Sequence, residues 1–192
     1  IEMIEPSFNQ MQVNQGIDLG FADGVRSLMR QDPDIIMVGE IRDQDTANMA
    51  IQAALTGHLV LSTLHTNDAP SSLTRLHDLG VQPFLTSATI LGILAQRLVR
   101  QLCPHCKEMG NIDAQQWEHL TFDYVMEMPS QIYQAKGCEA CRHTGYKGRV
   151  GIYEFMPITL DTKQKISSNA TLDQLRQQAK KEGVEPLRIT GA

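Results

Sequence analysis

Residues 32–43 read DPDIIMVGEIRD. The Asp-Pro pair breaks the helical pattern before it, and four consecutive apolar residues at 35–38 are typical of a buried strand in a parallel sheet. Gly39 and Glu40 follow at the carboxyl end of that strand, where open α/β sheets bind their ligands. In a nucleotide hydrolase, a carboxylate at that place can polarise the attacking water. From this stretch alone, a simple polar turn after a core strand is the alternative.

On both sides of this stretch the apolar pattern alternates between helical and strand periods. Helices are expected over 21–29, over 47–55 with Asp43 or Asp45 as cap and Gly57 as stop, and through Leu73 up to Gly80. A longer helix is expected from Pro83 towards Leu102. Strands are expected over 35–38, 58–64 and 149–155, and a capping box at Thr171 opens a last helix. The order strand, helix, strand implies parallel pairing, so the fold class is α/β.

Residues 57–68 read GHLVLSTLHTND, which places polar side chains at the carboxyl end of the second strand. Thr63 and His65 are expected beside Glu40 if the two strands are neighbours. Hydroxyl and imidazole groups there can sense a γ-phosphate and orient water. The alternative is that His58 follows a helix cap and His65 caps a strand, with no part in chemistry.

Two C-x-x-C pairs, separated by 31 residues, supply four thiols: Cys103, Cys106, Cys138 and Cys141. Four cysteines suit a tetrahedral zinc ion, and four protein ligands leave no open position for water, so the site is expected to be structural. Two disulfides, a redox pair or inert thiols are the alternatives. His105 and His143 lie in or beside the pairs and are not needed as ligands. The intervening residues are expected to form a small lobe with a minor core of Trp117, Leu120, Phe122, Tyr124 and Val125.

The 192 residues suffice for one well-packed domain with a small satellite. The formal net charge is −5 and no segment is strongly basic, which argues against binding to nucleic acid or anionic lipid. The apolar runs are too short to span a bilayer, and the first residues lack the pattern of a signal peptide. Membrane-spanning, disordered, collagen-like and secreted disulfide-rich classes therefore fit poorly.

Several long segments of the chain resemble the secretion ATPases of type II secretion and type IV pilus assembly, the GspE/PilB group. The segments are NQMQVN (9–14), RSLMRQDPD (26–34), GEIRD (39–43), TGH (56–58), TLHTN (63–67), AQRLVR (95–100), LCPHC (102–106) and GRVGIYE (148–154). The resemblance covers nearly the whole chain. It implies a RecA-like parallel sheet, present in part, with flanking helices, a tetracysteine zinc lobe and C-terminal helices.

The resemblance also implies roles for individual residues. Residues 34–40 resemble an atypical Walker B, residues 57–67 a His box, and Glu2 aligns with the last acidic residue of an Asp box. Catalytic roles are expected of Glu40, His65 and Glu2, with Glu40 activating water. Nucleotide-binding roles are expected of His58, Thr63, Arg42 and Asp34. The four cysteines resemble the zinc ligands of the secretion and assembly members.

The chain departs from the family in one respect, because it contains no G-x-x-x-x-G-K-[ST] phosphate loop. In the family that loop precedes the Asp box, so the chain is expected to be the C-terminal part of a motor domain. The expected parts are a RecA-like core at 1–102, a zinc lobe at 103–142 and a C-terminal strand and helices at 143–192. Alone it is expected neither to bind ATP tightly nor to hydrolyse it.

The resemblance implies that the full-length protein uses ATP and Mg²⁺ and assembles as a hexamer. It is expected at the cytoplasmic face of the inner membrane, attached only through platform proteins, with no nucleic-acid partner. Two other classes of function stay open from the sequence. One is a zinc-ribbon module that binds nucleic acid, which the charge argues against. The other is a non-catalytic scaffold in which the zinc lobe docks a membrane partner.

Overall fold

The computed structural model describes residues 4–192, which fold into two compact units. The first unit contains the described residues up to Ile93 together with Pro157–Ala179, and the second contains Leu94–Met156 and Lys180–Ala192. The domain boundaries expected at 102 and 142 stay a prediction. The second unit is larger than the segment between the cysteine pairs because it includes most of the two longest strands.

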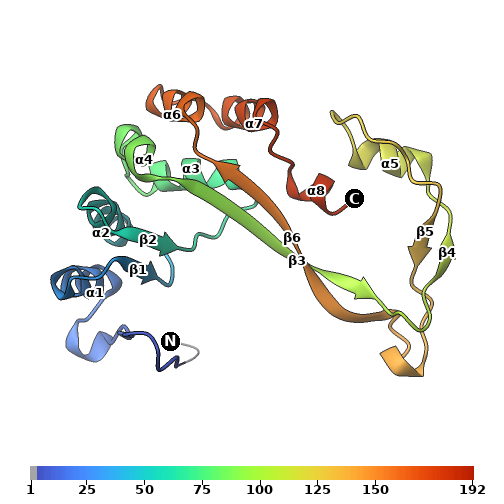
Figure 1. Ribbon diagram of the computed structural model, residues 1–192, viewed down its shortest axis with the longest axis horizontal. Helices are drawn as coiled ribbons and strands as arrows, with labels where there is room; N and C mark the ends of the chain where they lie inside the picture. Colours follow the sequence, from blue (N-terminus) through green and yellow to red (C-terminus); the bar gives the residue numbers. More distant parts are fainter. Residues whose placement is uncertain (1–3) are drawn as a thin grey trace. The chain divides into compact units, whose positions relative to one another are not determined.

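The first unit consists of helices and a short parallel sheet (Figure 1). Its elements, in chain order, are α1 (Phe21–Leu28), β1 (Ile35–Val38), α2 (Gln44–Leu55), β2 (Leu59–Ser62), α3 (Ala69–Asp78), α4 (Pro83–Thr89), α6 (Leu160–Ser167) and most of α7 (Leu172–Lys181). Two 3₁₀ turns, Gln15–Ile17 and Met29–Gln31, flank α1. The expected helices at both ends of β1 and the α/β class are thereby confirmed.

Strands β1 and β2 pair in parallel, with Ile35 opposite Leu59 and Val38 opposite Ser62. One face of this pair is covered by α1 and α2 through a core of Val25, Ile36, Val38, Met49 and Ala53. The other face is open: Ile35 is 59% exposed and Met37 is 71% exposed. The expectation that all of 35–38 is buried is therefore wrong, since within the described residues helices cover only one face of this sheet.

Local capping chemistry explains where several helices begin and end. Asp43 is the N-cap of α2 and accepts a hydrogen bond from the Thr46 amide at 2.8 Å, which resolves the choice between Asp43 and Asp45. Gly57 follows the same helix with a φ of +101°, a conformation that favours glycine. The predicted capping box of α7 is confirmed, because Thr171 and Gln174 exchange hydrogen bonds between their side chains and amides.

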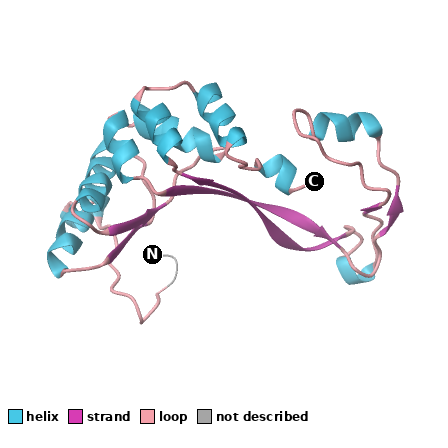
Figure 2. Cartoon of the chain, turned by 45° about the horizontal axis from the view of Figure 1, so that its top comes forward, coloured by secondary structure: helices cyan, strands magenta, loops and turns pink. Residues whose placement is uncertain are grey.

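The long helix expected from Pro83 to Leu102 is wrong. Helix α4 ends at Thr89, Ile90 is extended, and β3 occupies Gly92–Leu102. This strand runs beside β6 (Tyr146–Pro157) in the opposite direction, as the arrows in Figure 1 and the ribbon in Figure 2 show. Good helix formers in 94–101 are thus overridden by a pairing partner about 50 residues further along the chain.

The second unit also contains β4 (Glu108–Gly110), α5 (Ala114–Leu120), β5 (Ile132–Gln134), a 3₁₀ turn at Glu139–Cys141 and α8 (Leu187–Thr190). Strands β4 and β5 pair antiparallel. The minor core expected in this region is wrong for Leu120, Phe122 and Val125, which are exposed. What holds the loop after α5 is polar, since Arg188 donates to the carbonyl oxygens of Leu120 and Phe122, and Lys180 donates to that of Asp123.

No helix among residues 4–192 combines the length and the apolar character that crossing a bilayer requires.

One partly buried histidine is expected to make the stability of the first unit depend on pH. The Nε2 atom of His77 on α3 is buried without a hydrogen-bond partner, and burial lowers the pKa of this side chain despite the nearby Asp78 carboxylate. Because the folded state disfavours the proton, stability is expected to fall as the pH drops through 6.5, the ordinary value, and to level off below the folded pKa. Thermal midpoints at about pH 7.5 and about pH 5.5 measure this loss. The His77→Gln variant should lose less over that interval, and equal losses would contradict the prediction.

Candidate functional site

Four side chains gather at the carboxyl edge of the β1–β2 pair: Glu40, Arg42, Thr63 and His65, here called the Glu40 group. The Arg42 guanidinium lies 2.6 Å from Glu40 Oε1, and His65 Nε2 lies 3.5 Å from Glu40 Oε2. The Glu40 side chain is 21% exposed, whereas that of His65 is 90% exposed. The carboxylate is thus held between two nitrogen groups, and the imidazole reaches it from the solvent side.

Two hydrogen bonds past the strand ends hold the Glu40 group in place. The Thr63 hydroxyl donates to the Gly39 carbonyl oxygen at 2.7 Å, and the Ile41 amide donates to the Thr63 carbonyl oxygen at 3.1 Å. Glu40 therefore lies between two residues that are each bonded to Thr63. The expected proximity of Thr63 and His65 to Glu40 follows from parallel strands that end at the same edge.

His58 and Asp34 lie at the opposite edge of the same strand pair, directly before β2 and β1. Four strand residues separate the two edges, which is about 13 Å of strand. His58 Nδ1 donates to the Ala53 carbonyl oxygen at 2.9 Å and lies 3.0 Å from the Thr56 hydroxyl, so the imidazole caps the end of α2. The structure does not bring these two predicted nucleotide-binding residues to the Glu40 group. Glu2, the third predicted catalytic residue, lies outside the described residues.

The loop that carries His65 ends at Asp68, which the sequence did not single out as functional. Asp68 is the N-cap of α3 and accepts from the Ser71 amide at 2.8 Å. Its second oxygen accepts from Arg176 on α7, at 3.1 Å from Nε and 2.7 Å from a terminal nitrogen. Burial raises the pKa of Asp68, but the hydrogen bonds from Ser71 and Arg176 outweigh it, so the net shift is downward. The pattern Asp-x-x-Ser signals the cap, whereas no local pattern signals a partner 108 residues away.

The four cysteines form the second cluster, and their sulfur atoms all lie within 4.8 Å of one another. The Sγ atoms are 4.0 Å apart for Cys103 and Cys138, and 3.8 Å apart for Cys106 and Cys141 and for Cys138 and Cys141. A disulfide needs about 2.05 Å, and all four thiols are free. A tetrahedral zinc ion with Zn–S bonds of about 2.3 Å would place its sulfurs about 3.8 Å apart. The donor set therefore fits a metal ion of this kind.

Backbone amides point at two of these sulfurs. The amides of Cys138 and Gly145 each donate to Cys141 Sγ at 3.2 Å, and the Gly137 amide donates to Cys106 Sγ at 3.3 Å. Burial raises the pKa of Cys141, but these amides and the neighbouring thiols lower it to about 6. Burial, reinforced by the other thiols, raises the pKa of Cys106 to about 12. The backbone amides thus favour the thiolate form of Cys141, whereas burial disfavours that of Cys106, and a bound cation would favour ionisation of both.

Gly145 is the backbone position on which this cluster depends most. Its φ is +77°, its amide donates to Cys141 Sγ, and its carbonyl oxygen accepts from the Cys103 amide at 2.9 Å. A Cβ placed there would lie 2.6 Å from the Ala135 Cβ, well inside contact distance. Gly145→Ala is therefore expected to lower the affinity for Zn²⁺ by about 10- to 100-fold, the range of other changes to groups that support metal ligands.

Competition of the purified protein with a chromogenic zinc chelator measures that affinity. Gly183→Ala is a matched control, because Gly183 has a φ of +81° and open space at its Cβ, so it carries the same backbone cost without the clash. An affinity of the Gly145→Ala variant equal to that of the Gly183→Ala variant would contradict the prediction.

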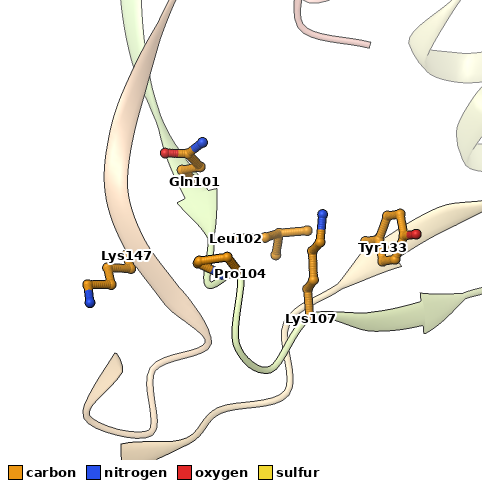
Figure 3. A pocket seen from close by; sticks show the side chains of 6 residues that line it. All are labelled: Gln101, Leu102, Pro104, Lys107, Tyr133 and Lys147. Carbon is orange, nitrogen blue, oxygen red and sulfur yellow. The ribbon is translucent and has the colours of Figure 1, made fainter. Parts of the chain in front are cut away.

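A shallow pocket of about 440 Å³ lies beside the cysteines in the second unit (Figure 3). Its lining residues are Gln101, Leu102, Pro104, Lys107, Tyr133 and Lys147. The Lys107 ammonium lies 4.3 Å from the centre of the Tyr133 ring, a cation–π contact. The charged residues that line the pocket are Lys107 and Lys147.

All 192 residues match the family described as Type II/IV secretion system protein. The chain belongs to this family. It is 78% identical over 192 residues to the type IV pilus assembly ATPase TfpB of Acinetobacter baylyi, and 51% identical over 170 residues to the type II secretion system ATPase E of Vibrio cholerae. These alignments cover 100% and 88% of the chain but 33% of each relative, so the chain spans about a third of their length.

Among solved structures, the chain is similar to the pilus retraction motor PilT with bound ADP, at 26% identity and a TM-score of 0.53. That similarity covers 89% of this chain and 42% of the PilT chain. The ATPase DotB of Yersinia pseudotuberculosis is similar in fold, with a TM-score of 0.55 over 84% of this chain and 33% of its own. The expected resemblance to the secretion and pilus ATPases is confirmed.

Proposed function

We propose that the full-length protein is an ATPase that uses ATP and Mg²⁺ to power type II secretion or type IV pilus assembly. The observation that carries the proposal is the position of Glu40, placed at the carboxyl edge of a parallel strand pair between Arg42 and His65. Ligands bind at this edge of open α/β sheets. The family supports the reaction, because its members include proteins named as ATPases of pilus assembly and of type II secretion.

In this proposal Glu40 is the general base of hydrolysis. Arg42 holds Oε1, which leaves Oε2 to accept the proton of the attacking water. His65 lies next to Oε2 and can orient that water or donate to a phosphate oxygen as negative charge develops. Mg²⁺, when bound, neutralises charge on the phosphates. Thr63 fixes the backbone at Gly39, the residue directly before Glu40.

The remaining parts of the proposal concern assembly. The β1–β2 pair is part of a RecA-like sheet, and the phosphate-binding lysine comes from the part of the full-length protein that this chain does not span, so the chain alone is inactive. The protein acts as a hexamer at the cytoplasmic face of the inner membrane, where platform proteins attach it. Zn²⁺ on the four cysteines is structural, because four thiolates leave no position open for water.

ATP turnover by the full-length protein and by its Glu40→Gln variant tests this proposal. The competing function is a scaffold in which the cysteine lobe docks a partner and Glu40 has no chemical role. The two differ in outcome, because only the ATPase loses phosphate release when Glu40 is replaced.

A further inference from the structure

The loop between β2 and α3 carries His65. Within the Glu40 group, the His65 side chain is more exposed to solvent than those of Glu40 and Arg42. The His65 side chain is 90% exposed and meets Glu40 at 3.5 Å, so packing does not fix its position. The start of the loop is fixed, since Thr63 is bonded to Gly39 and Ile41. The position of His65 therefore depends on what holds the far end of the loop, at Asp68.

Asp68 anchors the far end with both carboxylate oxygens. Oδ1 accepts from the Ser71 amide and caps α3, while Oδ2 accepts from two nitrogens of Arg176. Thr66, inside the loop, bonds to the Asp68 carbonyl oxygen at 3.3 Å and lies 2.8 Å from the Ser72 hydroxyl. The loop is thus tied to the first turn of α3, and Arg176 ties that turn to α7.

We propose that Arg176 is a positioning residue that keeps His65 against Glu40 by clamping Asp68. The side chains of Arg176 and Asp68 are 47% and 23% exposed, and ion pairs at such exposure contribute little to stability. Two nitrogens on one oxygen do, however, fix the direction of the carboxylate. Only two residues separate His65 from Asp68, so a shift of Asp68 moves His65 as well. This inference rests on the proposed function.

Steady-state ATP turnover of the full-length protein with Arg176→Gln tests the inference. Displacing His65 is expected to lower kcat by about tenfold and to leave KM for ATP within about twofold, with an unchanged thermal midpoint. Arg176→Lys is expected to restore part of the loss, because an ammonium still reaches Oδ2 but cannot fix its direction. Asp68→Asn keeps a capping oxygen but removes the charge, and it should reproduce the loss without adding to that of Arg176→Gln.

Asp173→Asn is the matched control. Asp173 lies on α7, 3.8 Å from the same arginine, but it is 86% exposed, so its replacement is expected to leave kcat unchanged. Wild-type kcat in Arg176→Gln would overturn the inference, as would additive losses in the double variant, or a loss that Asp173→Asn shares. Glu40→Gln, measured in parallel, separates a failure of the role inferred for Arg176 from a failure of the proposed ATPase function. If it abolishes turnover while Arg176→Gln does not lower it, only the role of Arg176 fails; if it leaves turnover intact, the proposed function fails.

Discussion

Replacing Glu40 by glutamine in the full-length protein is expected to lower ATP turnover by about a hundredfold or more, while ATP binding is retained. Glutamine has nearly the same shape and can still accept a hydrogen bond from Arg42 through its amide oxygen. It cannot take a proton from water, so the base is lost without a change in packing. Phosphate release under saturating Mg²⁺ and ATP gives kcat, and titration with a fluorescent ATP analogue gives the dissociation constant.

Glu118→Gln is the control for this experiment, because Glu118 is an exposed carboxylate on α5 and outside the Glu40 group. It should turn over ATP at the wild-type rate. Turnover of Glu40→Gln within about threefold of wild type would rule out Glu40 as the general base, since such a base contributes at least about a hundredfold. That result would favour the scaffold function.

Replacing Cys141 by serine is expected to abolish zinc binding and to unfold the segment between the cysteine pairs. Cys141 is the sulfur that accepts hydrogen bonds from two backbone amides, and these lower its pKa to about 6, which favours the thiolate form that binds a metal ion. Structural zinc contributes about 10–16 kcal/mol to folding in zinc-finger peptides. Few apolar side chains within residues 107–137 are buried, since Phe122 and Val125 are exposed, so apart from the β4–β5 pairing and the bonds from Arg188 and Lys180 the segment depends on the metal site.

Elemental analysis of the purified protein measures the zinc content, and limited proteolysis reports on the segment between the pairs. The wild-type protein should hold close to one equivalent of zinc and become sensitive to protease after chelation. His105→Ala is the control, because His105 lies inside the first cysteine pair, is exposed and supplies no sulfur. Zinc retention by Cys141→Ser, or loss of zinc from His105→Ala, would contradict a ligand set of four thiolates.

Features with a local cause were the ones that the sequence could predict. The cap at Asp43, the stop at Gly57 and the box at Thr171 each follow from groups a few residues apart. The cysteine cluster could be predicted because each pair has the C-x-x-C spacing of a metal-binding turn, and a tetrahedral metal ion needs both pairs. The meeting of Glu40 and His65 needed one further step, the rule that parallel strands end at a common edge.

Features with a distant cause were missed or mistaken. The segment 92–102 has a helical composition and becomes a strand because β6 pairs with it. Ile35 and Met37 are apolar and yet exposed, since burial depends on what covers a face and not on the strand itself. The bond between Arg176 and Asp68 joins residues 108 positions apart, and neither is unusual among its neighbours in the sequence.

The attachment of the loop after α5 has an evolutionary consequence. Arg188 and Lys180 donate hydrogen bonds to the backbone carbonyl oxygens of Leu120, Phe122 and Asp123. Every amino acid carries a backbone carbonyl group, so these bonds do not depend on which side chains the loop has. The exposed side chains of Phe122 and Val125 are therefore expected to vary among homologues, whereas Tyr124 is constrained because its ring lies 4.8 Å from the Lys180 ammonium and 5.2 Å from the Arg188 guanidinium. The two cations are not free to vary in this way, because a neutral replacement at either position would leave the carbonyl oxygens without their donor. Substitutions at the loop residues whose carbonyl oxygens accept these bonds are thus expected to be tolerated, whereas substitutions of Lys180 and Arg188 are expected to be selected against.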